Sequence, residues 1–503
     1  MGKGFYITTA IAYINSPPHI GFSYEVIAAD IIARFRRLRG EKVFFLTGSD
    51  EHSLNVYRRA KEEGFSPQEY CDRMASLYQE TWKKLGITYD RFIRTSSPSH
   101  KRVVQRVIQR LLDTPYIYRA KYGGWYCVSC EAFYQEKELK EGLCPVHQRK
   151  PQWVEEENYF FALSHFEDFL KEYIQKNPQF IEPEERRNEV WGILNQGLQD
   201  VSISRQRAEW GIPFPGREKE SVYVWVDALI NYISGIGFEE EEELFQDFWP
   251  ADIHLIGKDI IRFHTLLWPA LLKAVNLPLP RRIFSHGFLN LRGEKISSTR
   301  GNILSPEMLL KEFPADAIRF YLFREGNFGQ DRDFSLENLT ERYNRELAND
   351  WGNLFQRVCG MVARFSEGKL EGKGRMGAKE REISQLAQEV YRASTTFLEE
   401  LKFSQALSEI WKLVRRVNQY IEEKAPWKLF REGRKEEVET TLYTSLEGIR
   451  VAALLLYPFV PFSSSKILDT LGTPGKWDEA GEWGRLPLPL TVSLPSPIFP
   501  RKK

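Results

Sequence analysis

The chain of 503 residues carries 70 basic and 69 acidic side chains, so its formal net charge is only +1. This balance excludes a protein that holds nucleic acid by overall charge, and any such partner must meet local basic patches. Five cysteines are too few for a disulfide scaffold. No apolar run reaches the roughly 18 residues of a membrane span, and residues 1–15 lack the regions of a signal peptide. We therefore expect a cytoplasmic protein of several domains with no membrane contact.

The first motif lies between an apolar strand and a helix. Residues 5–12 are strand-like, residues 16–24 read Ser-Pro-Pro-His-Ile-Gly-Phe-Ser-Tyr, and apolar residues then recur at helical spacing: Ile27, Ile31, Phe35 and Leu38. A helix start presents free N–H groups and a positive dipole end to phosphate. Gly21 lets a ligand approach because it has no Cβ. The sequence therefore predicts a nucleotide site here.

Three of the five cysteines lie in one short segment. Cys127 and Cys130 form one half, and Cys144 with His147 forms the other. Four soft ligands in two such halves can close a tetrahedral zinc site without a catalytic water. The alternative is a set of unrelated thiols in a reducing compartment. Cys71 and Cys359 lie in helix-like patterns, where we expect buried, inert thiols.

The order of the remaining elements predicts an interrupted parallel sheet followed by helices. Strand-like and helical runs alternate over the first hundred residues, as in βαβ units. Short aromatic segments replace this pattern after residue 114, and strand-like runs return at 222–226 and 253–256. From about residue 341 a helical stripe runs through Leu347, Trp351, Leu354, Val358, Val362 and Phe365. This predicts an all-helical bundle, and a packed tail after residue 471.

A second motif, residues 293–302, reads Gly-Glu-Lys-Ile-Ser-Ser-Thr-Arg-Gly-Asn. A lysine, hydroxyls and glycines on a loop suit the charge that develops on phosphates. With the first motif, it resembles the HIGH and KMSKS signatures of class I aminoacyl-tRNA synthetases in altered form. Further segments are similar to the methionyl-tRNA synthetases over residues 4–470: Asp200–Arg205, Trp210–Pro213, Tyr223–Ala228, Ile256–Asp259 and Ala425–Trp427.

The resemblance implies an α/β fold: a Rossmann-type class I synthetase catalytic domain with a zinc-knuckle insertion, followed by an all-α anticodon-binding bundle. We expect the catalytic domain at 1–113 and 222–290, interrupted by the insertion at 114–221. A linking, stem-contact region with the KMSKS-like loop should follow at 291–345, the anticodon-binding domain at 346–470 and a C-terminal tail at 471–503. The insertion is too short for a separate editing domain, and no appended dimerisation module is present, so we expect a monomer.

The resemblance assigns a methionine site. Asp50 matches the carboxylate that takes the α-amino group, although Asp also suits a helix N-cap. The side-chain pocket would comprise Ile11, Trp225, Ala228, Leu229, Tyr232, Ile260 and His264. A thioether needs polarizable apolar walls, with Tyr and His offering a weak donor near sulfur. The alternative is that each of these residues belongs to the ordinary core.

The implied reaction uses ATP and Mg²⁺ to form methionyl-adenylate, which is then transferred to the 3′ end of methionine tRNA. The residues that match the family's ATP-binding positions are His19, Gly21, Lys258, Asp259, His286, Gly287 and Lys295. The residues that match its catalytic positions, in the two signatures, are His19, Gly21, Lys295 and Ser297. Asn353, Arg357 and Trp427 match the residues that read the anticodon. The alternative for this trio is an ion pair at Arg357 and a packing role for Trp427.

Four positions depart from the family pattern: Ala12, Phe22, Ser53 and Ser298. Phe22 replaces the second histidine of the first signature and cannot donate to phosphate, and Ser298 replaces the second lysine of the other. Each loss is expected to cost a few kcal/mol of transition-state stabilisation unless it is compensated. These changes leave a second hypothesis open, a synthetase-like paralogue that binds methionine or tRNA with weak or no activation.

Overall fold

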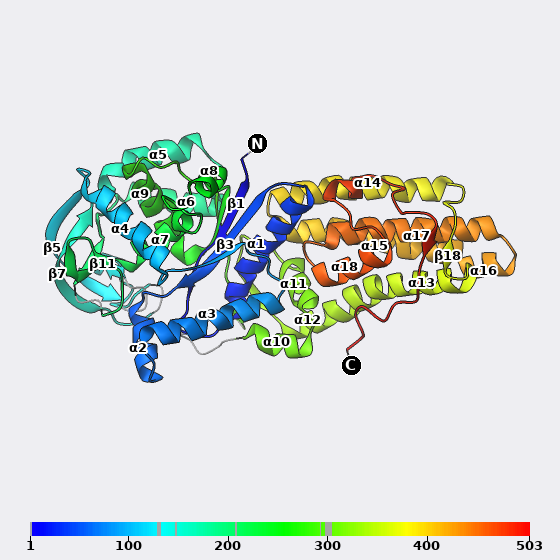
Figure 1. Ribbon diagram of the computed structural model, residues 1–503, viewed down its shortest axis with the longest axis horizontal. Helices are drawn as coiled ribbons and strands as arrows, with labels where there is room; N and C mark the ends of the chain where they lie inside the picture. Colours follow the sequence, from blue (N-terminus) through cyan, green and yellow to red (C-terminus); the bar gives the residue numbers. More distant parts are fainter. Residues whose placement is uncertain are drawn as a thin grey trace.

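The structure is a computed structural model that describes residues 3–127, 132–145, 148–206, 209–291, 293–296 and 304–502. The molecule is elongated (Figure 1). Strands β5 (Ile117–Cys127) and β7 (Gln152–Phe161) lie at one end, and the short helix α16 (Pro426–Arg431) lies at the other. A parallel sheet occupies the part nearer β5, and long helices form the part nearer α16.

The central sheet is parallel throughout. Its order is β2 (Ala12–Tyr13), β3 (Val43–Asp50), β1 (Phe5–Thr9), β13 (Ile253–Gly257), β14 (Ile283–His286) and β8 (Ile181–Glu182), with β4 (Arg91–Arg94) also paired to β3. Every residue of β1 and β13 is buried, as expected for strands covered on both faces. The predicted α/β class with a resumed parallel sheet is confirmed.

Two features of the sheet differ from the sequence prediction. The strand predicted at 222–226 is wrong, because β12 (Arg217–Val222) ends there and helix α7 (Val224–Ser234) begins. All eleven residues of α7 are buried, so this helix has no polar face that periodicity could detect. In addition, β8 lies within the predicted insertion at 114–221 yet pairs with β14. A strand of two residues has no sequence pattern of its own.

This part of the molecule also contains helices that pack on the sheet or on one another. They are α1 (Ile20–Leu38), α2 (Leu54–Glu62), α3 (Pro67–Lys84), α4 (Pro98–Leu112), α5 (Glu167–Lys176), α6 (Glu184–Asn195), α7, α8 (Glu242–Phe248), α9 (Trp268–Ala274), α10 (Pro306–Glu312) and α11 (Ala315–Arg324). Of the four inward positions predicted for α1, Ile27, Ile31 and Phe35 are fully buried, and Leu38 is partly buried against the core.

Three small antiparallel or mixed sheets surround the core. In the inserted segment, β6 (Ala132–Tyr134), β5, β7 and β9 (Val201–Ser202) form one sheet, and β10 (Ser204–Gln206), β12 and β11 (Pro213–Phe214) form the second. The third joins β16 (Glu294–Lys295), β15 (Leu289–Leu291) and β17 (Arg332–Phe334), and it carries the chain from the sheet into α12 (Leu336–Arg342).

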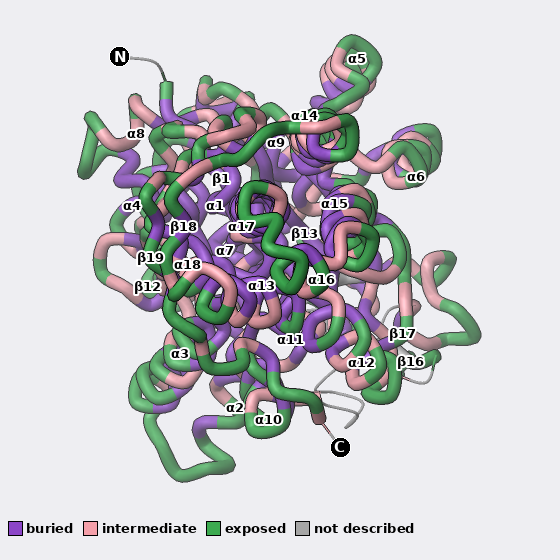
Figure 2. Tube along the Cα trace, turned by 90° about the vertical axis from the view of Figure 1, so that its right-hand side faces the viewer, coloured by how far each residue is buried: buried purple, intermediate pink, exposed green. Residues whose placement is uncertain are grey.

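The C-terminal part is a helical bundle, as predicted. A π-helical stretch, Tyr343–Gly352, continues into α13 (Asn353–Phe365), followed by α14 (Ala378–Glu399), α15 (Phe403–Lys424), α16, α17 (Lys435–Leu456) and α18 (Pro461–Thr470). Seen end-on, the buried residues lie at the centre and the exposed ones at the rim (Figure 2). The tail packs against the bundle: Trp477 is fully buried, and β19 (Leu490–Thr491) pairs with β18 (Lys369–Leu370).

A buried carboxylate joins the catalytic part to the bundle. Asp30, in α1, accepts hydrogen bonds from Arg34 Nε at 2.8 Å, from Arg319 Nη2 at 2.7 Å and from the N–H and hydroxyl of Thr88 at 2.7 and 2.6 Å. Arg319 also donates to the carbonyls of Pro458 and Phe459, which follow α17. Burial alone would raise the pKa of Asp30, but these partners hold it below its usual value.

Replacing Arg319 with Met should destabilise the protein strongly. The change leaves Asp30 buried with one charged partner fewer, which costs about 3–5 kcal/mol. The midpoint of urea unfolding measures the effect. Arg59→Ala is the matched control, because its ion pair with Glu62 is exposed on both sides and should contribute about 0–1 kcal/mol. Equal effects of the two changes would contradict the structural role given to Arg319.

Candidate active site

A cavity of about 580 Å³ lies at the carboxyl ends of the parallel strands. Residues 10–13 follow β1, Asp50 ends β3, Gly257 and Asp259 lie at the end of β13, and His286 ends β14; all line the cavity. The carboxyl edge of a parallel sheet is where ligands bind in open α/β folds. Helices α1 and α7 and residues of the inserted segment complete the walls.

The start of α1 brings the two signature segments together. His19 is the N-cap, and its Nδ1 accepts the N–H of Phe22 at 3.2 Å, which leaves Nε2 as the protonated nitrogen of a neutral ring. The N–H of Ile20 donates to the carbonyl of Leu304, just after the second signature, at 2.9 Å. Ile296 lies across from Gly21, and both line the cavity. The tertiary fold thus places residues 19–21 beside Ile296 and Leu304, the described residues on either side of the second signature.

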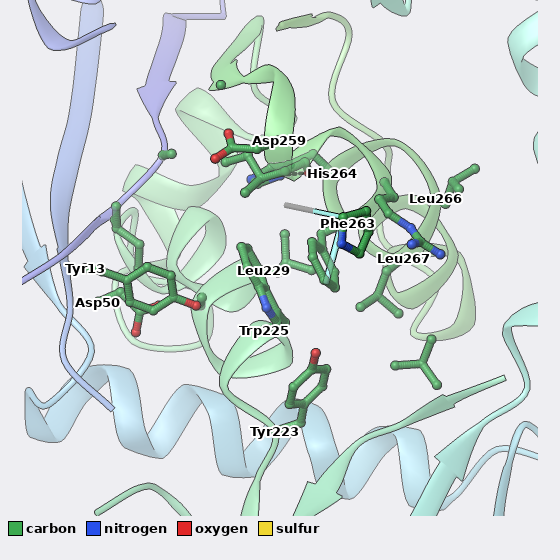
Figure 3. A pocket seen from close by; sticks show the side chains of 18 of the residues that line it. Tyr13, Asp50, Tyr223, Trp225, Leu229, Asp259, Phe263, His264, Leu266 and Leu267 are labelled. Atoms are coloured by element: carbon green, nitrogen blue, oxygen red, sulfur yellow. Dashed lines mark hydrogen bonds between the residues drawn. The ribbon is translucent and has the colours of Figure 1, made fainter. Parts of the chain in front are cut away.

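All eight residues predicted to bind methionine line this cavity: Ile11, Asp50, Trp225, Ala228, Leu229, Tyr232, Ile260 and His264. Four of them come from one face of α7, where positions 225, 228, 229 and 232 recur at helical spacing. Figure 3 shows Trp225 and Leu229 in the middle of the pocket, Asp50 beside Tyr13, and His264 near Asp259. The prediction that these residues share one pocket is correct.

Two aromatic residues that contact Trp225 in the pocket escaped the sequence analysis. The indole of Trp225 stacks on Phe263, with centroids 3.9 Å apart and planes 5° apart, and the ring of Tyr13 meets Trp225 edge-on at 6.0 Å. Both rings line the cavity. Phe263 lies in the π-helical turn Phe263–Leu267, so regular helical spacing could not place it. Tyr13 lies in the two-residue strand β2, which has no sequence pattern of its own.

The Tyr232–His264 pair is a closed hydrogen-bond relay. Burial lowers the pKa of His264 to about 4, so the ring is neutral at neutral pH. Its Nδ1 donates to the carbonyl of Ile260 at 3.0 Å, and Nε2 therefore accepts from the Tyr232 hydroxyl at 2.7 Å. The hydroxyl proton is engaged by His264. The sequence analysis expects Tyr232 and His264 to donate a hydrogen bond toward the sulfur. In the structure their protons are already engaged, so a thioether would meet an apolar wall here.

Asp50 and Ser53 have different tasks at the end of β3. Asp50 is 2% exposed and lines the cavity. The N-cap of α2 is Ser53, whose hydroxyl accepts the N–H of Val56 at 3.0 Å. The alternative that Asp50 serves as a helix cap is therefore wrong. The departure from the family pattern at position 53 also gains a local explanation, because serine is a good N-cap.

Glu25 is a further cavity residue that the sequence analysis missed. One carboxylate oxygen accepts the N–H of Ala10 at 2.7 Å, and the other meets His286 Nε2 at 2.8 Å. His286 Nδ1 lies 2.7 Å from the carbonyl of Gly287. Glu25 therefore ties the loop after β1 to the end of β14. An acidic residue on an otherwise apolar, buried stretch of α1 was the available signal.

Several predicted ATP residues lie elsewhere or are not described. Lys258 pairs with Asp331 at 2.6 Å and, like Gly287, is not part of the cavity lining. A Cβ on Gly287 would lie 2.0 Å from the backbone of Gln330, so glycine is needed there for close packing. Lys295 lies in β16, and its side chain is not described; Ser297 and Ser298 lie outside the described residues.

Phe22 lines the cavity and belongs to an aromatic cluster. Its ring stacks on Trp82 with centroids 6.0 Å apart and meets Tyr78 edge-on at 6.4 Å. Both partners come from α3, and the Tyr78 hydroxyl donates to the carbonyl of Ser16 at 3.2 Å. The ring therefore supports residues 16–22 by packing, where the family's histidine would be a donor.

The anticodon residues and the two described members of the predicted metal set lie outside the cavity lining. Cys127 and Cys144 are buried together against Tyr134, whereas Cys130 and His147 are outside the described residues. Cys71 and Cys359 are fully buried, and burial raises the pKa of both thiols, as expected for inert cysteines.

At the far end of the molecule, Asn353 is exposed and Arg357 lies one turn further along α13. Arg357 forms an ion pair with Glu422 and donates to Asn418 at 3.3 Å. Trp427 is half-buried against the bundle core. The two alternatives named for this trio, an ion pair at Arg357 and a packing role for Trp427, are thus both present. A surface ion pair contributes little stability, so it does not prevent Arg357 from contacting RNA.

Comparisons with known proteins agree with this arrangement. The family model described as "tRNA synthetases class I (M)" matches residues 5–152 and 136–359. The model described as "Anticodon binding domain of methionyl tRNA ligase" matches residues 371–501. The chain belongs to the methionyl-tRNA synthetase family. Its fold is the class I synthetase catalytic domain joined to a helical anticodon-type domain.

Curated relatives and solved structures cover nearly the whole chain. A methionine–tRNA ligase of Thermotoga maritima is 43% identical over 98% of this chain and 80% of its own length, and one of Caldanaerobacter subterraneus is 44% identical over 94% and 74%. The Mycobacterium tuberculosis methionyl-tRNA synthetase in complex with methionyl-adenylate superposes with a TM-score of 0.95 at 41% identity, covering 99% of this chain and 100% of that one. Its apo form gives 0.89 at 38%, covering 100% and 99%.

Every helix in the described part of this synthetase-family chain is too short or too polar to span a bilayer.

The buried His264 should make stability depend on pH. Its pKa in the folded protein is about 4, below the ordinary value near 6.5, so folding favours the neutral ring. The stability that it contributes is complete above pH 6.5 and is lost as the pH falls toward 4, by up to about 1.4 kcal/mol per pH unit. His264→Gln should flatten the unfolding free energy over this window. The exposed His165, replaced in the same way, should leave the slope unchanged, and an equal flattening would contradict the assignment.

Proposed function

We propose that this chain is a methionine–tRNA ligase that activates methionine with ATP and transfers it to the 3′ end of methionine tRNA. The observation that carries the proposal is the cavity itself, where eight predicted methionine residues meet His19 and the start of α1. Membership of the methionyl-tRNA synthetase family supports the same activity. The chain also superposes on a relative whose structure is in complex with methionyl-adenylate.

The chain's own residues would act mainly by position and charge. The Asp50 carboxylate takes the ammonium of methionine, and the stacked Trp225–Phe263 rings with the Tyr232–His264 relay enclose the side chain. The His19 Nε2 and the α1 N-terminus face the triphosphate. A carboxylate oxygen of methionine attacks the α-phosphorus, the bond to the β-phosphate breaks, and pyrophosphate leaves. Mg²⁺ bound with ATP would share the phosphate charge. A ribose hydroxyl of the tRNA then attacks the acyl carbon and releases AMP.

Asp50→Asn should impair the use of methionine far more than that of ATP, because the ammonium loses its charged partner. Loss of one charge-assisted contact should raise the methionine KM by at least about tenfold. Methionine-dependent exchange of pyrophosphate into ATP measures both substrates. Asp72→Asn removes an exposed carboxylate outside the cavity and serves as the control. Unchanged methionine kinetics would reject the role of Asp50, and absence of exchange in the unaltered protein would favour the non-activating paralogue.

We further propose that Cys127, Cys130, Cys144 and His147 hold one structural zinc ion. The two described cysteines fit such a site, because both are buried and pack in one small cluster with Tyr134. Cys127 ends β5, and the N–H of Cys144 donates to the carbonyl of Arg149 at 2.9 Å, so the backbone fixes both positions. Thiolates are the ligands that zinc prefers, and four protein ligands would leave it structural.

Purified protein should contain one zinc ion per chain, measured by atomic emission spectrometry. Cys144→Ser should lose the metal and lower the melting temperature, since a structural metal stabilises only the folded state. Cys71→Ala, in the buried core of α3, should keep the zinc. A metal-free protein of unaltered sequence, or full zinc in Cys144→Ser, would exclude the site.

Asn353, Arg357 and Trp427 are proposed to read the anticodon. They lie on α13 and α16 in the helical bundle, and α16 is at the end of the molecule opposite the inserted sheet (Figure 1). The elongated shape suits a tRNA whose anticodon and acceptor end are far apart. An exposed amide, a guanidinium and a half-exposed indole supply the edge hydrogen bonds and stacking that single-stranded bases need.

Trp427→Ala should weaken tRNA charging and spare adenylate formation. Loss of a base–aromatic stack costs about 1–3 kcal/mol, which would appear in kcat/KM for tRNA. Pyrophosphate exchange provides the internal comparison. Phe65→Ala removes an exposed aromatic residue from the catalytic part and should change neither reaction. An equal loss of both reactions in Trp427→Ala would instead show that the indole is structural.

A further inference from the structure

A buried cluster of two histidines and one aspartate lies behind the methionine pocket. Asp227 Oδ2 meets His52 Nδ1 at 2.7 Å, and Oδ1 meets His100 Nε2 at 2.6 Å. His100 Nδ1 meets the Ser234 hydroxyl at 2.7 Å. Asp227 is 1%, His52 5% and His100 0% exposed, and none of them lines the cavity. The proposed reaction therefore gives these three groups no direct role.

The direction of the hydrogen bonds follows from the charge of the carboxylate. Burial alone would raise the pKa of Asp227, but the charge interaction with His52 and hydrogen bonds from His100 and His52 lower it to about 2. An ionised carboxylate only accepts hydrogen bonds. His52 therefore donates from Nδ1 and His100 from Nε2. His52 Nε2 is buried without a hydrogen-bond partner among the described residues, so the bond to Asp227 is its one polar anchor there.

Asp227 lies on the opposite face of α7 from the methionine pocket. Trp225, Ala228, Leu229 and Tyr232 form the pocket face, whereas Asp227 and Ser234, seven residues apart, point toward α4 and the loop after β3. His52 stands two residues after Asp50 in that loop. The Asp227–His52 bond thus links the helix that encloses the side chain of methionine to the loop that carries the proposed ammonium ligand.

The loop after β3 is fixed at each neighbouring residue. Glu51 binds Arg94 through both carboxylate oxygens, at 2.7 and 3.0 Å, and its N–H donates to Thr95 at 2.8 Å. His52 binds Asp227, and Ser53 caps α2. Asp50, by contrast, faces the cavity. A methionine bound as proposed spans from Asp50 to the rings of α7. The distance between Asp50 and these rings therefore decides how well the length of methionine fits the cavity.

We propose that Asp227, with His52 and His100, is a positioning group that sets the distance between Asp50 and the methionine side-chain pocket. This inference rests on the proposed use of methionine as substrate. A carboxylate that accepts a charge-assisted bond on each oxygen restrains both neighbours in direction as well as distance. The cluster would therefore affect methionine binding and leave the phosphate-binding end of the cavity, at His19, unaffected.

The test compares His52→Ala with His52→Asn. The asparagine amide nitrogen can stand where Nδ1 stood and donate to Asp227, whereas alanine removes the donor. Calorimetric titration of methionine into nucleotide-free protein should show Kd raised about tenfold in His52→Ala and nearly restored in His52→Asn. The KM for ATP in pyrophosphate exchange should stay within about twofold in both. A general loss of packing would not be rescued by asparagine and would not separate the two substrates.

Further variants keep the test decisive if one of them misfolds. Asp227→Asn should raise the methionine Kd as His52→Ala does, and His100→Gln, which keeps a donor near Nε2, should have a smaller effect than His100→Ala. An unchanged methionine Kd in folded His52→Ala, or equal changes for methionine and ATP, would overturn the proposal. Absence of methionine binding and exchange in the unaltered protein would reject the proposed function itself, which is a separate outcome.

Discussion

The buried contact between Asp30 and Arg319 holds the two parts of the molecule in one arrangement. Asp30 lies on the same helix as His19, about 16 Å further along at 1.5 Å per residue. Arg319 reaches from α11 to the carbonyls at the end of α17. A continuous helix is stiff, so the position of the bundle and the start of α1 at the cavity are mechanically connected. A charged pair tolerates full burial only when every polar atom is satisfied, and here backbone carbonyls and Thr88 complete the set.

The cavity depends on groups that are far apart in the sequence. Glu25 joins the loop after β1 to His286, and Leu304 joins the second signature to Ile20. The Glu25–His286 and Ile20–Leu304 contacts each join residues that are more than two hundred positions apart in the sequence. The Glu25 carboxylate is therefore already engaged with His286 and with the backbone of Ala10 before any substrate arrives. Such pre-organisation avoids reorganisation when charge develops on phosphate.

Two of the departures from the family pattern, Phe22 and Ser53, have local physical reasons, and nothing in the structure explains Ala12. Phe22 supports the first signature by packing on Trp82 and Tyr78. Ser53 caps α2 and thereby fixes the end of β3. Phe22 thus contributes packing and Ser53 a helix cap where the family has other residues. Neither substitution by itself removes the site. This arrangement agrees with an enzyme whose first signature has been rebuilt around an aromatic ring.

The sequence by itself determined the fold class, eight of the residues that share the pocket and the order of the parts. Motifs such as those at 16–24 and 223–228 carry this information because their residue types match a chemistry at a fixed spacing. It could not determine that α7 is a helix, since a segment buried on all sides has no periodicity. Nor could it find Phe263, Glu25 or the Asp227 cluster. Their roles arise from contacts between distant segments, and only the tertiary structure decides which side chains meet, which protons they share and which face the cavity.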